Sequence, residues 1–239
     1  MPVDPKTQSK QLYETSRRNF LQKTAGATLG GLIAATSFDF SNARPAAAQT
    51  TLSPDDALQV LVDGNRRFTS GKLTMLGKDV ASLRQKTAEK QEPFAGVLSC
   101  ADSRVPVELI FDRSIGQIFV TRVAGNVVSP EIIASLEYGA IVLGTRVILV
   151  MGHGNCGAVR AAIEGKEVPG MISVLYPRIQ PAVDQSGPDL EAASRANAKI
   201  QAGLLRQSST VISGLVKDKK LRVVPAYYDV SGGSVTFLE

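Results

Sequence analysis

Hydrophobic residues after position 50 alternate between helical spacing and short, continuous apolar runs. The first helical pattern begins with an N-cap residue, a proline and two acids, Ser53-Pro54-Asp55-Asp56, and continues to about Arg67. A second pattern covers about residues 78–90, and a third begins at Ser129-Pro130 and ends at Gly144. Residues 188–217 also have apolar positions at helical spacing.

Short apolar runs between these helices predict buried strands. The runs are Phe94–Ser99, Gln117–Arg122 and Arg146–Met151. Because helices separate the runs, we expect an α/β fold with a mostly parallel central sheet flanked by helices. Leu221–Val230 and Val235–Leu238, joined by a Ser-Gly-Gly turn, predict a terminal hairpin or two successive edge strands. No Pro/Gly/Ser-rich linker divides residues 49–239, so the pattern predicts one domain.

The first 48 residues have a different pattern, which predicts an export leader. Paired Arg17 and Arg18 precede an uncharged, Ala/Gly-rich run, Thr24–Phe38. That run falls short of the roughly 20 strongly apolar residues that cross a membrane, and Ala46-Ala47-Ala48 offers small residues for cleavage. The order is typical of a twin-arginine signal peptide cleaved after Ala48. An N-terminal amphipathic helix is the alternative. Export would deliver the protein to the periplasm or, in a photosynthetic cell, to the thylakoid lumen.

The net charge of the chain is moderately positive, and part of it belongs to the predicted leader. The whole chain has 27 Lys and Arg against 22 Asp and Glu, a formal net charge of +5. Removal of residues 1–48 lowers this charge by three, because six basic and three acidic residues leave with the leader. The remaining chain has no Lys/Arg block and no aromatic residues interleaved with basic ones. We therefore expect no nucleic-acid partner.

Few side chains could hold a soft or borderline divalent metal: Cys100, Cys156 and the single histidine, His153. Cys100 directly follows the first predicted strand and His153 follows the third, where parallel sheets gather their ligand sites. Two thiolates and one imidazole leave one tetrahedral position open, as in catalytic zinc sites. Two bland alternatives stay open: a disulfide or redox pairing of the two cysteines, and inert buried thiols beside a core histidine.

The surroundings of these residues resemble a known family. Cys100-Ala101-Asp102-Ser103-Arg104 and Gly152-His153-Gly154-Asn155-Cys156-Gly157 are similar to the signatures C-x-D-x-R and H-x-x-C-G of the β-carbonic anhydrases. The resemblance continues over the mature chain through Asp63–Phe68, Arg122–Asn126, Glu137-Tyr138 and Ala226–Asp229. It implies the family's fold, N-terminal helices that pack on a partner subunit in a homodimer or a multiple of dimers, and a Zn²⁺ cofactor. It also implies reversible hydration of carbon dioxide to bicarbonate and a proton through zinc-bound hydroxide.

The resemblance also implies roles for residues around the metal. Asp102 would accept a hydrogen bond from the nucleophile, and Arg104 would hold the Asp102 carboxylate through a charge-assisted pair. Gln91, Phe119 and Tyr138 resemble substrate-pocket residues of the plant-type branch of the family. The alternatives are a surface salt bridge for the dyad, an exposed glutamine, and two ordinary core aromatic residues.

The chain lacks two side chains that bear on regulation and on proton transfer. It contains no tryptophan, which bicarbonate-regulated members use in an inhibitory anion pocket, so we expect no such regulation. It has no second histidine to shuttle protons, which leaves buffer, water or a tyrosine. Hydrolysis of carbonyl sulfide or carbon disulfide at the same site stays open. So does a non-catalytic zinc or redox relative, although a non-catalytic relative would be expected to lack Asp102 or Arg104.

Overall fold

A computed structural model describes residues 50–166 and 170–239, so the predicted leader lies outside the described residues. The described helices, including three short 3-10 turns labelled η2 to η4, and strands follow one another in this order: α2 (Pro54–Thr69), η2 (Met75–Gly77), α3 (Val80–Thr87), β1 (Ala95–Ser99), α4 (Val107–Ile110), β2 (Ile118–Arg122), η3 (Ala124–Asn126), α5 (Pro130–Ile141), β3 (Val147–His153), α6 (Gly157–Glu164), η4 (Met171–Leu175), α7 (Tyr176–Ser186), α8 (Leu190–Ser208), α9 (Thr210–Lys217), β4 (Arg222–Tyr228) and β5 (Val235–Phe237).

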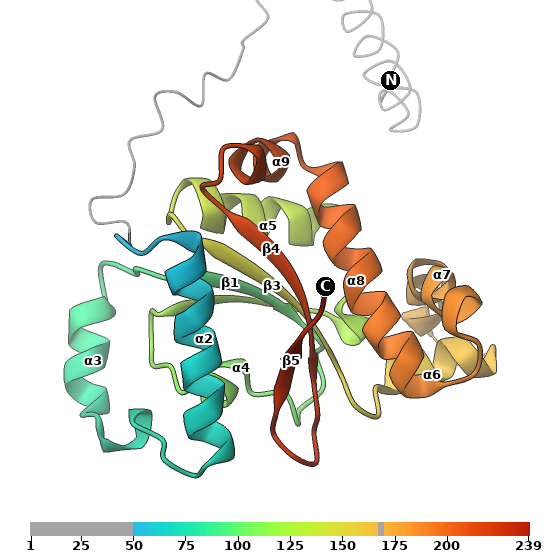
Figure 1. Ribbon diagram of the computed structural model, residues 1–239, viewed down its shortest axis with the longest axis horizontal. Coiled ribbons are helices and arrows are strands. Elements are labelled where there is room, and N and C mark those ends of the chain that lie inside the picture. Colours follow the sequence, from blue (N-terminus) through green and yellow to red (C-terminus); the bar gives the residue numbers. More distant parts are fainter. Residues whose placement is uncertain (1–49, 167–169) are drawn as a thin grey trace, which may run out of the picture. The chain divides into compact units, whose positions relative to one another are not determined.

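The strands of the described residues form one five-stranded sheet in the order β2-β1-β3-β4-β5 (Figure 1). The first four are mutually parallel, and β5 pairs with β4 in the antiparallel direction. In this register Ser99 at the end of β1 lies beside Arg122 of β2 and Met151 of β3. The predicted mostly parallel sheet and terminal hairpin are both confirmed.

Helices cover both faces of the sheet, on opposite sides of the strands in Figure 1. One face, with Val97 and Leu149, packs on α2 and α4. The other, with Leu98 and Ile148, packs on α5, α8 and α9. This burial of both faces explains why the strands read as continuous apolar runs rather than alternating ones. None of the described helices combines the length and apolar character needed to span a membrane.

Two differences from the predicted boundaries bear on the packing. β3 continues two residues beyond Met151, because Gly152 and His153 still pair with β4. A Cβ on Gly152 would lie 2.7 Å from the Ser194 carbonyl oxygen, so glycine at this position lets α8 approach closely. The helix predicted over residues 188–217 is two helices, α8 and α9, separated at Ser209. The Ser209 hydroxyl accepts the Ile212 N–H at 2.9 Å and donates to Glu137 at 2.6 Å, which starts α9 and joins it to α5.

The Asp63–Phe68 segment joins α2 to the rest of the domain. Gly64 packs so closely on the chain after α4 that a Cβ would lie 1.9 Å from the Phe111 carbonyl oxygen. The buried Asn65 amide donates to the Gly233 carbonyl at 2.9 Å and accepts the Val235 N–H at 2.9 Å. This segment therefore has a structural role in holding the terminal hairpin.

Asp112 gives a first testable prediction. Its carboxylate is fully buried and accepts hydrogen bonds from Arg67 Nε, the Thr74 hydroxyl and the backbone N–H groups of Thr74 and Met75. Burial raises the pKa of this carboxyl, but these donors, led by the Arg67 guanidinium, outweigh burial and hold the pKa well below its usual range. We expect Asp112→Asn to lower the free energy of unfolding by about 2 kcal/mol at neutral pH.

The same carboxylate makes this difference depend on pH. A carboxyl with a lowered folded-state pKa contributes stability that is complete above its unfolded pKa of about 3.9 and is lost as the pH falls further. Urea unfolding at pH 7 and pH 3 measures the difference in the free energy of unfolding between wild type and Asp112→Asn. Asp218→Asn, at an exposed site, is the matched control. A gap between wild type and Asp112→Asn that stays the same at pH 3 would contradict the assignment.

Candidate metal centre

The predicted metal ligands come together at the carboxyl edge of the sheet. Cys100 directly follows β1, His153 is the last residue of β3, and Cys156 is the N-cap of α6. One donor atom of each, the two sulfurs and a ring nitrogen, lies within 4.8 Å of the others. All three residues are buried, with exposed fractions of 4%, 0% and 1%. The structure thus assembles one compact donor set from positions 56 residues apart in the sequence.

One ring nitrogen of His153 has a lone pair that a metal could bind. His153 Nδ1 lies 2.9 Å from the Gly154 carbonyl oxygen and donates to it, which leaves the lone pair on Nε2. That Nε2 is buried and has no hydrogen-bond partner among the described residues. A buried acceptor without a partner is costly, and a metal ion at Nε2 removes this cost. The donor set and the free Nε2 together fit a zinc ion.

Both cysteines are free thiols rather than a disulfide. The hydrogen bond from the Cys156 thiol is the largest influence on Cys100 and lowers its pKa against the opposing effect of burial. The backbone N–H of Gly125, which lies 3.3 Å from the Cys100 sulfur, lowers it further. The site therefore stabilises a thiolate at Cys100, and thiolates are the form in which cysteine binds metal.

The Asp102 carboxylate, which is bound by Arg104, lies beside the Cys-His-Cys cluster. Asp102 Oδ1 accepts from Arg104 Nε at 2.9 Å, and Oδ2 accepts from Arg104 Nη2 at 2.7 Å, so the pair is bidentate. The Arg104 guanidinium also donates to the Asn155 carbonyl at 3.1 Å, which connects the Asp102–Arg104 pair to the loop between His153 and Cys156. Asp102 Oδ2 lies 4.0 Å from His153 Nε2, next to the donor set without joining it. Hydrogen bonding by Arg104 holds the pKa of Asp102 well below its usual range.

Arg122 supports the chain between Cys100 and Asp102, a role that the sequence alone does not predict. This residue ends β2 and donates through Nε to the Cys100 carbonyl at 3.0 Å and through Nη2 to the Asp102 carbonyl. It therefore fixes the backbone on both sides of Ala101. Its place in the Arg122–Asn126 motif was the available signal, but the motif alone does not say which backbone groups the guanidinium reaches.

The three predicted pocket residues do not join the metal centre within this chain. Phe119 and Tyr138 contact each other, with ring centroids 6.3 Å apart, and Tyr138 is 48% exposed. Phe119 pairs with Gly96, four residues before Cys100, or about 13 Å along the strand. Gln91 is exposed and precedes β1 at the opposite edge of the sheet. Within one chain these residues are away from the donor set.

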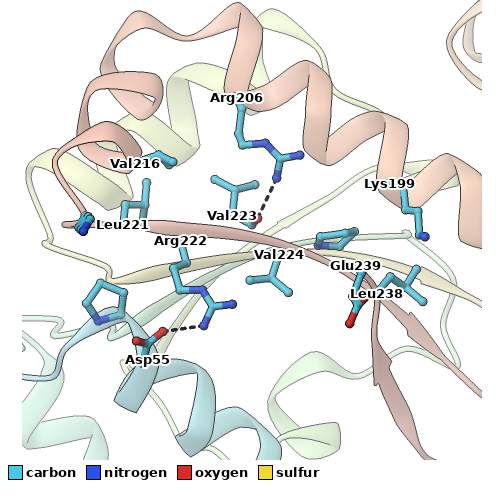
Figure 2. A pocket seen from close by; sticks show the side chains of 13 residues that line it. Asp55, Lys199, Arg206, Val216, Leu221, Arg222, Val223, Val224, Leu238 and Glu239 are labelled. Atoms are coloured by element: carbon cyan, nitrogen blue, oxygen red, sulfur yellow. Dashed lines mark hydrogen bonds and ion pairs between the residues drawn. The ribbon is translucent and has the colours of Figure 1, made fainter.

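A cavity of about 520 Å³ also lies away from the metal centre, beside the first residues of β4 (Figure 2). Arg222, at the start of β4, pairs with Val147 at the start of β3, about 20 Å along the strand from His153. Two of the cationic side chains that line the cavity are engaged with other groups of the protein: Arg206 donates to the Val223 carbonyl at 2.9 Å, and Arg222 pairs with Asp55 at 2.6 Å. We therefore place the chemistry at the Cys-His-Cys cluster. A parallel α/β sheet that carries this cluster and a carboxylate at its carboxyl edge is the arrangement expected of a metal-dependent enzyme.

Comparison with known proteins identifies the family. A family model described as carbonic anhydrase matches residues 95–235. Carbonic anhydrase 2 of Mycobacterium tuberculosis (strain CDC 1551 / Oshkosh) is 32% identical over 189 residues, which cover 76% of this chain and 91% of that protein. The carbonic anhydrase of Mycolicibacterium smegmatis is 33% identical over 190 residues, 75% and 91% of the two chains. The solved Coccomyxa β-carbonic anhydrase in complex with acetazolamide superposes with a TM-score of 0.58 at 25% identity, covering 76% and 86%. The chain belongs to the β-carbonic anhydrase family and is an enzyme of the carbonic anhydrase class.

Proposed function

We propose that this chain catalyses the reversible hydration of carbon dioxide to bicarbonate and a proton, with Zn²⁺ held by Cys100, His153 and Cys156. The observation that carries the proposal is the buried Nε2 of His153, which has no hydrogen-bond partner among the described residues, in a cluster whose two sulfurs and one His153 ring nitrogen lie within 4.8 Å of one another. When bound, zinc would lower the pKa of a water molecule at its open position and so supply the nucleophile near neutral pH.

The Asp102–Arg104 dyad would orient that nucleophile. Asp102 stays ionised because Arg104 lowers the pKa of its carboxyl, so Oδ2 can accept a hydrogen bond but not donate one. A hydrogen bond donated by the nucleophile to Oδ2 would direct an oxygen lone pair away from Asp102 and towards the carbon of the substrate. Arg104 keeps the carboxylate in place through two parallel hydrogen bonds. Water, buffer or a tyrosine would then remove the proton.

We further propose that a second copy of the chain completes the substrate pocket. Gln91, Phe119 and Tyr138 match the pocket positions of the plant-type branch, yet in a single chain they lie away from the metal donors. β2 is an edge strand of the sheet, and Tyr138 is exposed on the neighbouring α5. A dimer would supply these side chains to the partner's metal centre. Activity recovered on mixing inactive Cys100→Ser with inactive Gln91→Ala would support this, whereas mixtures that stay inactive although the subunits exchange would contradict it.

The substrate is tested by direct comparison. Stopped-flow hydration of carbon dioxide should be fast with the zinc-loaded mature chain, and turnover of carbonyl sulfide and carbon disulfide should be slow. A higher kcat/KM for either sulfur compound would reassign the substrate while leaving the metal centre intact. Zinc-loaded protein with no turnover of any of the three would indicate a non-catalytic relative.

We also propose that residues 1–48 export the protein through the twin-arginine route. Replacing both arginines, Arg17→Lys and Arg18→Lys, should leave uncleaved precursor in the cytoplasm, because the pair is what the route reads. Cell fractionation with an antibody, and N-terminal sequencing of exported protein for a start at Gln49, measure this. The matched control replaces Lys6 and Lys10 with arginine and should export normally. Unimpaired export of the double-lysine form would leave only a general secretory signal.

A further inference from the structure

The segment after β2 reaches the metal centre through one backbone group. Gly125 donates its N–H to the Cys100 sulfur at 3.3 Å. Its φ of +73° is in the left-handed region that favours glycine, and a Cβ would lie 2.8 Å from Ile179 Cδ1. The orientation of this N–H therefore depends on the left-handed conformation of Gly125, on which Ile179 of α7 packs closely. Other contacts must keep Gly125 in this conformation.

Two buried amides on α8 hold this segment from behind. Asn197 Nδ2 donates to the Gly125 carbonyl at 2.8 Å, and Gln201 Oε1 accepts the Val128 N–H at 2.8 Å. Both side chains are completely buried. Gln201 Nε2 also donates to Asn197 Oδ1 at 3.1 Å, so the two amides, one helical turn apart, form one connected unit.

Hydrogen bonds also hold the end of this segment at Val128. Gln201 Nε2 donates to the Arg178 carbonyl at 2.8 Å, and Arg178 Nη1 donates to the Val128 carbonyl at 2.8 Å. The Asn197 amide nitrogen thus donates to a backbone carbonyl, and the Gln201 amide nitrogen donates to a backbone carbonyl and to the Asn197 amide oxygen. Polar groups buried this deeply stabilise one geometry when all are paired, and they specify it more narrowly than apolar packing does.

We propose that Asn197 is a positioning residue for the metal centre, acting through the Gly125 carbonyl to aim the Gly125 N–H at the Cys100 thiolate. An N–H that donates to a metal-binding thiolate withdraws charge from the sulfur and fixes its direction. Partners of this outer kind are worth about 10- to 100-fold in metal affinity. The inference rests on the proposed metal assignment of Cys100, His153 and Cys156.

The test is Asn197→Asp, which keeps the size and the acceptor towards Gln201 but places an oxygen against the Gly125 carbonyl. Zinc affinity, measured by competition with a chromophoric chelator, should fall about 10- to 100-fold. In the cobalt(II)-substituted protein, the sulfur-to-cobalt absorption band should move to longer wavelength, because the thiolate loses a hydrogen bond. A merely structural role for Asn197 would not move this band. Ser194→Ala is the matched control: Ser194 is buried one turn earlier on α8, and its hydroxyl donates to the Leu190 carbonyl of its own helix.

Each outcome decides the inference. Unchanged zinc affinity and an unchanged cobalt band in folded Asn197→Asp would overturn it. If circular dichroism shows that Asn197→Asp does not fold, Asn197→Ser, which withdraws the donor without adding charge, takes its place under the same criteria. Wild-type protein that binds no zinc would instead overturn the metal assignment, which is a separate result from equal binding by wild type and variant.

Discussion

Cys100→Ser, His153→Ala and Cys156→Ser are each expected to lose zinc and carbon dioxide hydration together. Three protein donors leave no redundancy, so the loss of one should weaken zinc binding by more than about 100-fold, the upper range for an outer partner. Metal also contributes to folding, so the apparent melting temperature of each variant should stop responding to added zinc. Atomic absorption of the purified protein and stopped-flow hydration measure the two effects.

A control beside the ligand separates metal loss from general damage. Ser99→Ala alters a buried residue next to Cys100 whose hydroxyl makes only a long contact, 3.4 Å, to the Cys100 carbonyl. This variant should keep its zinc and its activity. Full zinc in any one of the three ligand variants would remove that residue from the donor set.

Asp102→Asn is expected to keep zinc and lose most of its activity. The amide fills the same space, but it lacks the negative charge that orients the nucleophile and that Arg104 holds. Loss of a group with this role costs about 10²- to 10⁴-fold in rate. Arg104→Ala should resemble it in kcat, because the carboxylate is no longer held. The double variant should be no slower than the slower single variant, as expected for residues that act as one unit.

The measurement is kcat for carbon dioxide hydration at matched zinc content. Glu108→Gln removes a carboxylate four residues beyond Arg104, in the first turn of α4, and should leave kcat near that of wild type. If Asp102→Asn hydrated carbon dioxide at the wild-type rate, the dyad would be structural, and the proposed mechanism would fail even with the metal site intact.

The grouping of Cys100, His153 and Cys156 was predictable because strand ends can be located in the sequence. Apolar runs locate β1 and β3, and in a parallel sheet their carboxyl ends must meet at one edge. Cys100 and His153 follow from this rule alone. Cys156 follows because a turn of three residues from His153 cannot carry it far away, and the structure places it at the start of α6.

Other features depend on contacts that no local pattern contains. α7 contains Pro181 in its interior, a residue that normally argues against a helix, yet packing of Ile179 stabilises it. Asn197 looks like an ordinary polar residue of a long helix until the segment around Gly125 packs on it. Gln91, Phe119 and Tyr138 match the family's spacing, but spacing does not say whether they serve their own chain or a partner.

The central claim is that one zinc ion in the Cys100–His153–Cys156 cluster makes this chain a carbon dioxide hydratase. The direct measurement is a titration of metal-free mature protein with zinc, in which carbon dioxide hydration and bound metal are recorded on the same samples. Activity should rise in proportion to bound zinc and stop rising at one zinc ion per chain. Full activity in the metal-free protein, or zinc bound at one per chain with no hydration of carbon dioxide, would contradict it.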